Sequence, residues 1–249
     1  MLSPVINLAL DKDQDFNTGH RKMQTKSIRS IRRAELSRAA FEAVVRYGLR
    51  KTTLEKVGDI AGVSKGVVLH HFKDKSALLE AVFRRSNTVL TASLVELYRH
   101  ADSPIERLWA IVIANFSEAI YNRRVCQAWV SLAAEIPHNT QCQRIQTACN
   151  ARIHSNLCHE LKHFLSKEDA ERSALQLGML IDGIWVRGGL NATPLTSSSA
   201  IAEMEYAIFK LLPADKDSVE KHKKAREKIE SVAKILLNSN SYKENMLQT

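Results

Sequence analysis

The segment of residues 51–83, KTTLEKVGDIAGVSKGVVLHHFKDKSALLEAVF, constrains the fold more than any other part of the chain. It predicts a short helix, a tight turn, a second short helix and the start of a long third helix. Gly62 permits the tight turn because glycine adopts left-handed conformations without strain, Ser64 can cap the second helix, and Asp74 is placed to begin the third. Such a helix-turn-helix can place its second helix in the major groove of DNA.

The residues before this segment also favour a helix. Residues 28–48 carry apolar side chains at four-residue steps, and Gly48 follows them where a helix often ends. Thr52 followed by Glu55 has the spacing of a capping box, which predicts that Thr52 caps the next helix.

Helical patterns continue through the second half of the chain. Ser103 and Pro104 predict a helix start, because proline is tolerated in a first turn, and Pro137 interrupts a later stretch. Two segments carry narrow apolar seams that suit packing of helix on helix. Such seams usually form the core of one chain, yet two of them leave a dimeric four-helix bundle open. The seams are Ala170, Ala174, Leu177, Ile181 and Ile184, and Ile201, Met204, Ile208 and Leu211.

Charge divides the chain into two unequal parts. The 249 residues carry a net charge of +9. Residues 1–100 hold 18 lysines and arginines against 10 acidic residues, whereas residues 101–249 hold 18 against 17. A basic block beside a near-neutral one suggests a module that binds a polyanion, joined to a part that does not. Charge alone fits a basic, soluble surface equally well.

These patterns predict an all-α protein with an N-terminal three-helix DNA-binding domain and a larger helical domain for ligand binding and dimerisation. We expect a flexible basic arm over residues 1–27 and the helix-turn-helix domain over residues 28–86. The ligand-sensing and dimerisation domain should cover residues 87–212, and a charged C-terminal helix or tail residues 213–249.

Nothing in the sequence predicts a disulfide or a membrane span. A chain of this size buries enough surface to fold without disulfides, and its four cysteines form no CxxC pair. No apolar run is long enough to cross a membrane, and the first residues do not have the pattern of a signal peptide. We therefore expect a cytoplasmic protein.

Several side chains of the helix-turn-helix are of types that contact DNA. Lysine, serine and histidine reach phosphates or base edges, and a small apolar side chain can touch a thymine methyl group. The basic arm before the first helix, with Lys26 and Arg29 among others, can enter an adjacent minor groove. The predicted DNA-binding residues are Arg32, Arg33, Thr52, Thr53, Ser64, Lys65, Gly66, Val67, Leu69, His70, His71 and Lys75.

The sequence AGVSKGVVLHHFKDKSALLEAV resembles the signature of TetR-family transcriptional regulators. The likeness extends over about 50 residues, from Arg33 to Phe83, and depends on the GVSKG core, the HxF that follows and the DK-xxLL junction. It implies an all-helical homodimer that binds a palindromic operator in double-stranded DNA and is released by a small ligand, at the bacterial nucleoid. Leu69 and His71 depart from the family, because many members carry tyrosine at these positions.

The second half is similar to the choline-responsive repressors of glycine-betaine synthesis. The likeness rests on IDGIWVRGGL at residues 181–190, on Asn115 and Phe116, on Trp129, and on RIQTACNARIHSNLC at residues 144–158. It implies a repressor of osmoprotectant synthesis that choline releases. A repressor that responds to another small hydrophobic or cationic ligand, as in efflux control, is the alternative.

A binding site for choline needs aromatic faces and a nearby carboxylate, each cation–π contact contributing about 0.5–2 kcal/mol. Asp182 and Trp185 are three residues apart and therefore share a helix face. For each aromatic residue a place in the core is the more common explanation, and Asp182 could instead pair with the partner subunit's Arg187. Where choline-type repressors carry more aromatics, this chain reads WVSLAAE. The predicted ligand-binding residues are Trp109, Phe116, Trp129, Glu135, Asp182 and Trp185.

Metal sensing, catalysis and DNA coating are the remaining alternatives. The chain has no Gly-rich phosphate loop and no GxSxG segment, and we expect no carboxylate–histidine cluster at ligand spacing. We therefore expect no enzyme, no cofactor and no metal. A coating protein would spread its basic residues over the whole chain. One loose group has spacings that fit no standard zinc pattern, and small buried cysteines explain it better: His138, Cys142, Cys149, His154 and Cys158.

Overall fold

The computed structural model describes residues 28–193, 195–212 and 215–239, and these residues form helices and no strand. The expected all-α class is therefore confirmed, while the expected arm of residues 1–27 lies outside the described residues. The helices are α1 (Ile28–Tyr47), α2 (Leu54–Ala61), α3 (Lys65–His71), α4 (Lys75–Tyr98), α5 (Pro104–Phe116), α6 (Arg123–Ala133), the short 3₁₀ helix η2 (Ile136–His138), α7 (Thr140–Leu161), α8 (Lys167–Leu190), α9 (Ser197–Leu211) and α10 (Lys216–Leu236).

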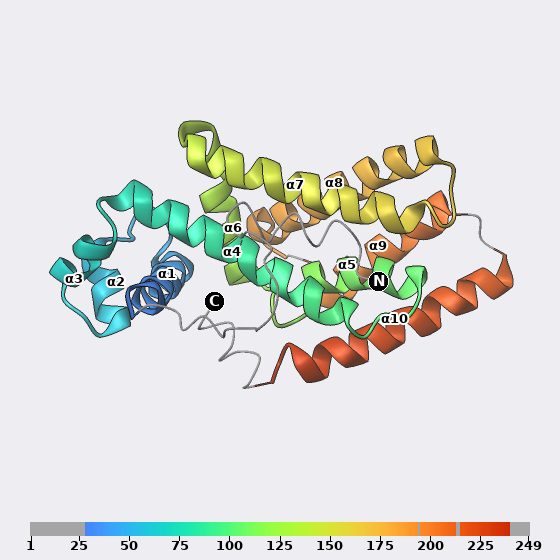
Figure 1. Ribbon diagram of the computed structural model, residues 1–249, viewed down its shortest axis with the longest axis horizontal. Helices are drawn as coiled ribbons and strands as arrows, with labels where there is room; N and C mark the ends of the chain where they lie inside the picture. The colour runs from blue at the N-terminus through green and yellow to red at the C-terminus, as the bar shows by residue number, and fades with distance from the viewer. Residues whose placement is uncertain (1–27, 194, 213–214, 240–249) are drawn as a thin grey trace, which may run out of the picture.

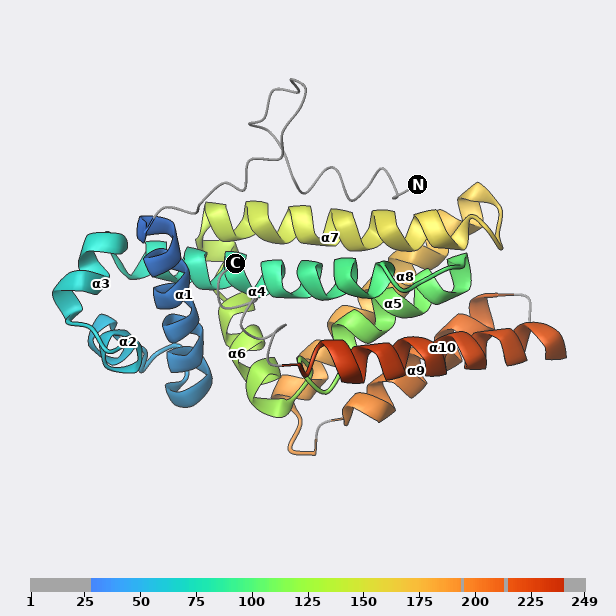
Figure 2. The ribbon, with the colours of Figure 1, turned by 60° about the horizontal axis from the view of Figure 1, so that its bottom comes forward.

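The molecule is elongated, with α1, α2 and α3 at one end (Figure 1). Helix α4 starts at that end and runs along the molecule beside α7, and α10 lies along the opposite edge (Figure 2). Because α4 is continuous from Lys75 to Tyr98, it passes through residue 86, where we expect the first domain to end. One rigid helix thus joins the two halves. None of the described helices is long and apolar enough to cross a membrane.

Local capping defines the helix-turn-helix. Gly62 ends α2 in the left-handed region at φ 67°, and the Ser64 side chain accepts the Val67 N–H at the start of α3. The Asp74 carboxylate likewise accepts the Ala77 N–H at 2.8 Å and begins α4. These three caps agree with the sequence prediction.

The predicted capping box at Thr52 is wrong. The residue that caps α2 is Thr53, whose side chain accepts the Lys56 N–H at 3.3 Å. Thr52 is buried, and its hydroxyl donates to the Gly48 carbonyl at 2.9 Å. Thr52 therefore stabilises the α1–α2 turn from inside.

Two apolar clusters hold the structure together. The smaller one gathers the inner faces of α1 to α4 around Leu36, Phe72 and Phe83, and it also includes Leu132 of α6 and Cys142 of α7. The helix-turn-helix thus rests on α6 and α7. The larger cluster fills the rest of the molecule, from the end of α4 to α10. Both predicted seams belong to it, since all their members are buried except Leu211, which is half-buried.

The charged C-terminal segment forms a helix, α10, which is one of the two structures expected for it. It packs along α5 and buries Ala225, Ile229 and Ala233. The Lys228 ammonium bonds Asp102 at 2.7 Å and Glu106 at 2.6 Å, which ties α10 to the start of α5. Residues 240–249 lie outside the described residues.

Candidate functional site

The recognition helix α3 exposes most of its length. Val68 and the following Phe72 are fully buried and anchor it. The residues on its other side are exposed, including the apolar Val67 at 36% and Leu69 at 43%. Apolar side chains left in water at a helix surface suit contacts with thymine methyl groups. Ser64, Lys65, Gly66, Val67, Leu69 and His70 are all exposed along this helix.

The predicted basic contacts surround this helix, and several already have partners. Arg33 lies within α1, not in an arm before it, and donates to the His71 carbonyl at 2.7 Å. Its guanidinium also stacks over the Phe72 ring at 4.5 Å. Arg32, also within α1, pairs with Glu35 at 2.8 Å. Arg33 therefore positions the end of α3.

Lys75 and His71 lie at the edge of this surface. The side chain of Lys75 is exposed at the start of α4, and its ammonium donates to the Leu49 carbonyl at 3.3 Å. His71 is half-buried, and its Nδ1 atom has no hydrogen-bond partner. Burial lowers the pKa of His71, and the charges of His70 and the nearby arginines lower it further.

A second candidate site lies where the helix-turn-helix meets the rest of the protein. A cavity of about 130 Å³ opens between α1, α4, α6 and α8. Its lining is mainly apolar and includes two of the predicted ligand residues, Trp129 and Trp185. The full lining is Phe41, Arg85, Ser86, Val89, Leu90, Ala119, Ile120, Val125, Trp129 and Trp185.

The aromatic rings behind this cavity form a continuous series. The ring centres of Trp129 and Trp185 are 5.9 Å apart, those of Trp185 and Tyr121 5.4 Å, and those of Tyr121 and Phe116 5.3 Å. The Tyr121 hydroxyl donates to the Ile184 carbonyl at 3.2 Å, which fixes the ring against α8. Three of the six predicted residues therefore come together: Phe116, Trp129 and Trp185.

The other three predicted residues lie elsewhere. Trp109 is fully buried on α5, where its indole N–H donates to His222 Nδ1 of α10 at 3.3 Å. Glu135 follows α6 near Cys142. Burial raises the pKa of the Cys142 thiol, and the charges of Glu80 and Glu135 raise it further. None of Trp109, Glu135 and Asp182 lines the cavity.

Asp182 is a half-buried carboxylate whose pKa burial raises. Burial raises the pKa of Cys149 of α7, and the charge of Asp182 raises it further. Trp185 lines the cavity and Asp182 does not.

Sequence reasoning missed most of the cavity region, including the lining residues Phe41 and Arg85 and the nearby Tyr121. Arg85 is the most consequential, because it brings a cation to an aromatic cavity. Burial lowers the pKa of Arg85, and the nearby Arg38 lowers it further. No local motif marks these positions, since Phe41 belongs to α1 and Arg85 to α4, far in sequence from the tryptophans.

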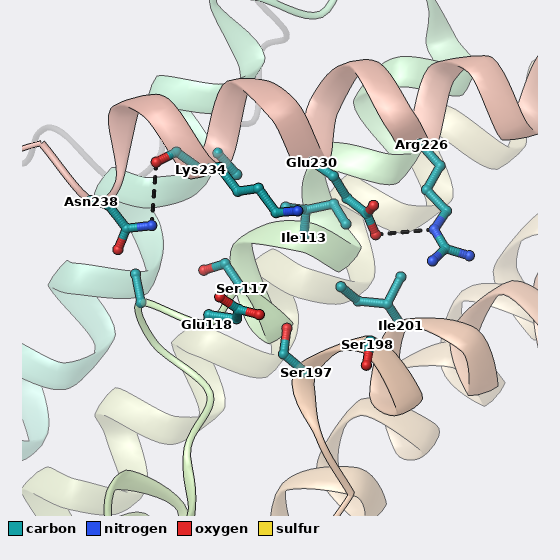
Figure 3. A pocket seen from close by; sticks show the side chains of 12 residues that line it. Ile113, Ser117, Glu118, Ser197, Ser198, Ile201, Arg226, Glu230, Lys234 and Asn238 are labelled. Atoms are coloured by element: carbon teal, nitrogen blue, oxygen red, sulfur yellow. Dashed lines mark hydrogen bonds and ion pairs between the residues drawn. The ribbon is translucent and has the colours of Figure 1, made fainter.

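Another cavity, of about 110 Å³, lies between α5, α9 and α10 (Figure 3). Arg226 and Glu230, one turn apart on α10, are bonded at 3.0 Å and line the cavity together with Lys234 and Glu118. The Ser117 hydroxyl beside it is buried without a hydrogen-bond partner. None of the predicted ligand residues lines this cavity.

The loose histidine–cysteine group does not assemble into a metal site among the described residues. All four cysteines are buried and free, and the closest contact in the group is between His154 and Cys158 Sγ at 3.7 Å. The cysteines of this group are small buried side chains, as expected. Potential metal ligands do converge at the end of α7, as described below.

Known proteins resemble this chain over both halves. Residues 36–82 match the profile of bacterial regulatory proteins of the tetR family, and residues 104–213 match the C-terminal profile of BetI-type transcriptional repressors. The HTH-type transcriptional regulator BetI of Burkholderia mallei is 37% identical over 191 residues, which cover 76% of this chain and 98% of that protein. The BetI regulator of Pseudomonas paraeruginosa is 34% identical over 181 residues, covering 72% and 92%.

Solved structures share the fold at lower identity. A transcriptional regulator from Rhodococcus sp. Rha1 superimposes with a TM-score of 0.64 at 23% identity, covering 72% of this chain and 95% of that chain. A TetR transcription regulator from Haloarcula marismortui gives 0.66 at 17% identity, covering 74% and 100%. Helix α10 lies beyond residue 213, where the BetI-type profile ends.

Proposed function

The chain belongs to the TetR family and is a transcriptional repressor with a BetI-type C-terminal domain, and from this premise we propose that a small effector binding beside Trp129 and Trp185 releases it from its operator. We propose choline as that effector and the synthesis of glycine betaine as the regulated pathway. The predicted residues of α3, with Arg32, Thr53 and Lys75, form the proposed DNA surface.

The position of the cavity is the observation that carries this proposal. Phe41 belongs to α1, and Arg85 and Ser86 belong to α4, the two helices that hold the recognition helix. Trp129 and Trp185 belong to α6 and α8 on the opposite wall. A ligand that fits only one spacing of these walls would shift the population toward that spacing. The two recognition helices would then no longer match half-sites about one helical turn apart.

Aromatic walls support a quaternary ammonium such as choline, because cation–π contacts replace its hydration. The opposing observation is Arg85, a cation in the lining, together with the lack of an acidic residue among those that line the cavity. This lining also fits the alternative, another small hydrophobic ligand.

An exposed apolar stripe on α8 supports a homodimer. Leu175, Met179, Val186 and Leu190 are 55%, 58%, 38% and 67% exposed, and their spacing puts them along one face. Tyr206 of α9, 64% exposed, extends the surface. Since monomeric proteins rarely expose contiguous apolar patches of this kind, we propose that α8 and α9 of two chains pack together. The buried seams of α8 and α9 lie on the other faces of these helices.

Tryptophan fluorescence tests the effector directly. The full chain is titrated separately with choline, betaine aldehyde and glycine betaine, and the same titrations are made on Trp109→Phe, which removes the indole that lies outside the cavity. Saturable quenching by choline alone, retained in Trp109→Phe, is the expected result. If none of the three compounds quenches the fluorescence, choline is excluded as the effector, and the alternative of another small hydrophobic ligand remains.

A further inference from the structure

The end of α7 carries a histidine–glutamate group that the sequence expectation overlooked. Residues 159–163 read HELKH, which is the HExxH spacing, so the expectation of no carboxylate–histidine cluster is wrong. One histidine belongs to the last turn of α7 and the other lies two residues beyond the helix, and together they can chelate one metal ion. The group is far from the aromatic cavity along the molecule and shares no residue with either cavity.

The potential ligand atoms of His159, Glu160 and His163 all lie within 4.8 Å of one another. Around a tetrahedral Zn²⁺, with Zn–N distances near 2.0–2.1 Å, such atoms are roughly 3.4 Å apart. His163 is exposed and lies two residues beyond Leu161, the last residue of α7. A change in its side-chain rotamer is the movement that the shorter Zn²⁺ spacing requires. The two imidazole rings are 6.0 Å apart and nearly perpendicular.

Glu160 gives an independent indication of a ligand. Its side chain is fully buried, and its Oε1 atom has no hydrogen-bond partner. The other oxygen, Oε2, accepts from Arg107 Nε at 2.9 Å. A buried carboxylate oxygen without a partner is costly, and coordination to a cation would satisfy it. Arg107 would then hold the carboxylate from behind, as hydrogen-bonded partners of metal ligands commonly do.

Residues of three helices surround the Glu160 carboxylate. Glu160 belongs to α7, Arg107 to the first turns of α5, and Tyr98 is the last residue of α4. The Tyr98 hydroxyl is also buried without a hydrogen-bond partner, and burial together with the Glu160 charge raises the pKa of Tyr98. The carbonyl end of α7 adds a negative partial charge that favours a cation.

We propose that His159, Glu160 and His163 bind a divalent transition-metal ion of the Zn²⁺ class, at a site separate from the effector cavity. Imidazole with a single carboxylate suits Zn²⁺, Ni²⁺ or Co²⁺ better than Mg²⁺ or Ca²⁺. The site binds and does not hydrolyse. In HExxH hydrolases the glutamate is a free general base, whereas Glu160 is buried and paired with Arg107. The bound ion fixes the end of α7 to α5 through the Glu160–Arg107 pair.

Isothermal titration of Zn²⁺ into the metal-stripped full chain tests the site, with Co²⁺ absorption as a second readout. One ion per chain is expected, with ligand-field bands of a site containing imidazole and no thiolate. His163→Ala should weaken binding by about tenfold or more. His138→Ala, which removes another exposed histidine, should leave binding unchanged.

Two results would overturn the proposal. One is equal Zn²⁺ affinity in His163→Ala and the unaltered chain. The other is loss of binding in Cys158→Ala with a thiolate charge-transfer band in the Co²⁺ spectrum, since this would place the ion on His154 and Cys158 instead. Neither readout involves DNA or the effector, so failure here leaves the proposed repressor mechanism untouched, and failure of choline binding leaves the metal site untouched.

Discussion

The DNA-reading end and the effector cavity are built in opposite ways. At the DNA end, the exposed residues of α3 come from one short stretch, and their positions depend on caps only a few residues away. At the cavity, the walls come from α1, α4, α6 and α8, and the tryptophans are 56 residues apart in the sequence. The first surface is a local structure on a small core, whereas the second exists only when the tertiary fold is complete.

Stability and function should therefore separate differently in the two regions. At the DNA end, the residues proposed to contact DNA are exposed and those that support them are buried, so a substitution should affect one or the other. At the cavity, Trp185 is both a lining residue and a member of the larger core, only 5% exposed. The predictions that follow test this contrast, beginning with the largest expected effect.

Phe72→Ala should cause the largest loss of stability. Phe72 is fully buried beneath α3, and truncating such a side chain costs about 3–5 kcal/mol. It also removes the ring under Arg33. Chemical denaturation measures the loss. Leu69→Ala, at an exposed position of the same helix, is the control: it should weaken operator binding with the free energy of unfolding unchanged. Equal destabilisation by both would contradict the separation of support and contact in α3.

Gly189→Ala should destabilise the sensor region by about 1–3 kcal/mol through overpacking. A Cβ at Gly189 would lie 2.8 Å from the Cys126 carbonyl oxygen, a backbone atom that cannot move aside cheaply. Gly66→Ala is the matched control at the DNA end, because the nearest atom to its Cβ would be Ser64 Oγ at 3.6 Å. Thermal unfolding should show a lower midpoint for Gly189→Ala only. A normal midpoint for Gly189→Ala would show that α8 can shift away from α6.

Trp185→Ala should abolish the response to the effector while operator binding persists. Coupling between two sites typically amounts to about 1–3 kcal/mol, and this variant should lose it. Because Trp185 also supports the core, Trp129→Leu, at a half-buried wall position, provides a second measurement. Operator binding by fluorescence anisotropy, with and without effector, gives both values. An intact response in both variants would move the effector away from this cavity.

Lys65→Ala and Lys75→Ala should have the smallest effects. Each is expected to weaken binding to every DNA sequence and to reduce the salt slope of binding by about 0.9, as one lost phosphate contact does. Lys234→Ala, in α10 at the other cavity, serves as the control and should leave the slope unchanged. If the salt slope is unchanged in Lys75→Ala, Lys75 makes no phosphate contact. Its role is then limited to its hydrogen bond to the Leu49 carbonyl.

The contrast also explains what the sequence could predict. Gly62, Ser64 and Asp74 act on neighbours within a few residues, so their caps were visible in the sequence. Thr52 was misplaced because Thr53, next to it, satisfies the same N-cap chemistry. The apolar seams of α8 and α9 were predicted because helical spacing fixes which side chains share a face.

The residues that line the cavity are harder to predict for the same physical reason. Both Trp109 and Trp185 are tryptophans of predicted helices, and the sequence does not show which of them lines a cavity. Trp109 packs where α10 meets α5, away from the cavity. Arg85 and Phe41 enter the lining through the crossing of distant helices, which no local pattern encodes. The HELKH group at residues 159–163 is a different case, because its HExxH spacing is a local pattern in the sequence.

The central claim is that occupancy of the Trp129–Trp185 cavity and operator binding are coupled. Operator affinity of the full chain, measured at fixed salt with and without saturating choline, tests it most directly. The account predicts that choline weakens operator binding by about 5- to 150-fold, the usual range of such coupling. If choline binds saturably beside Trp185 and the operator affinity is unchanged, the cavity is not the switch and the account is contradicted.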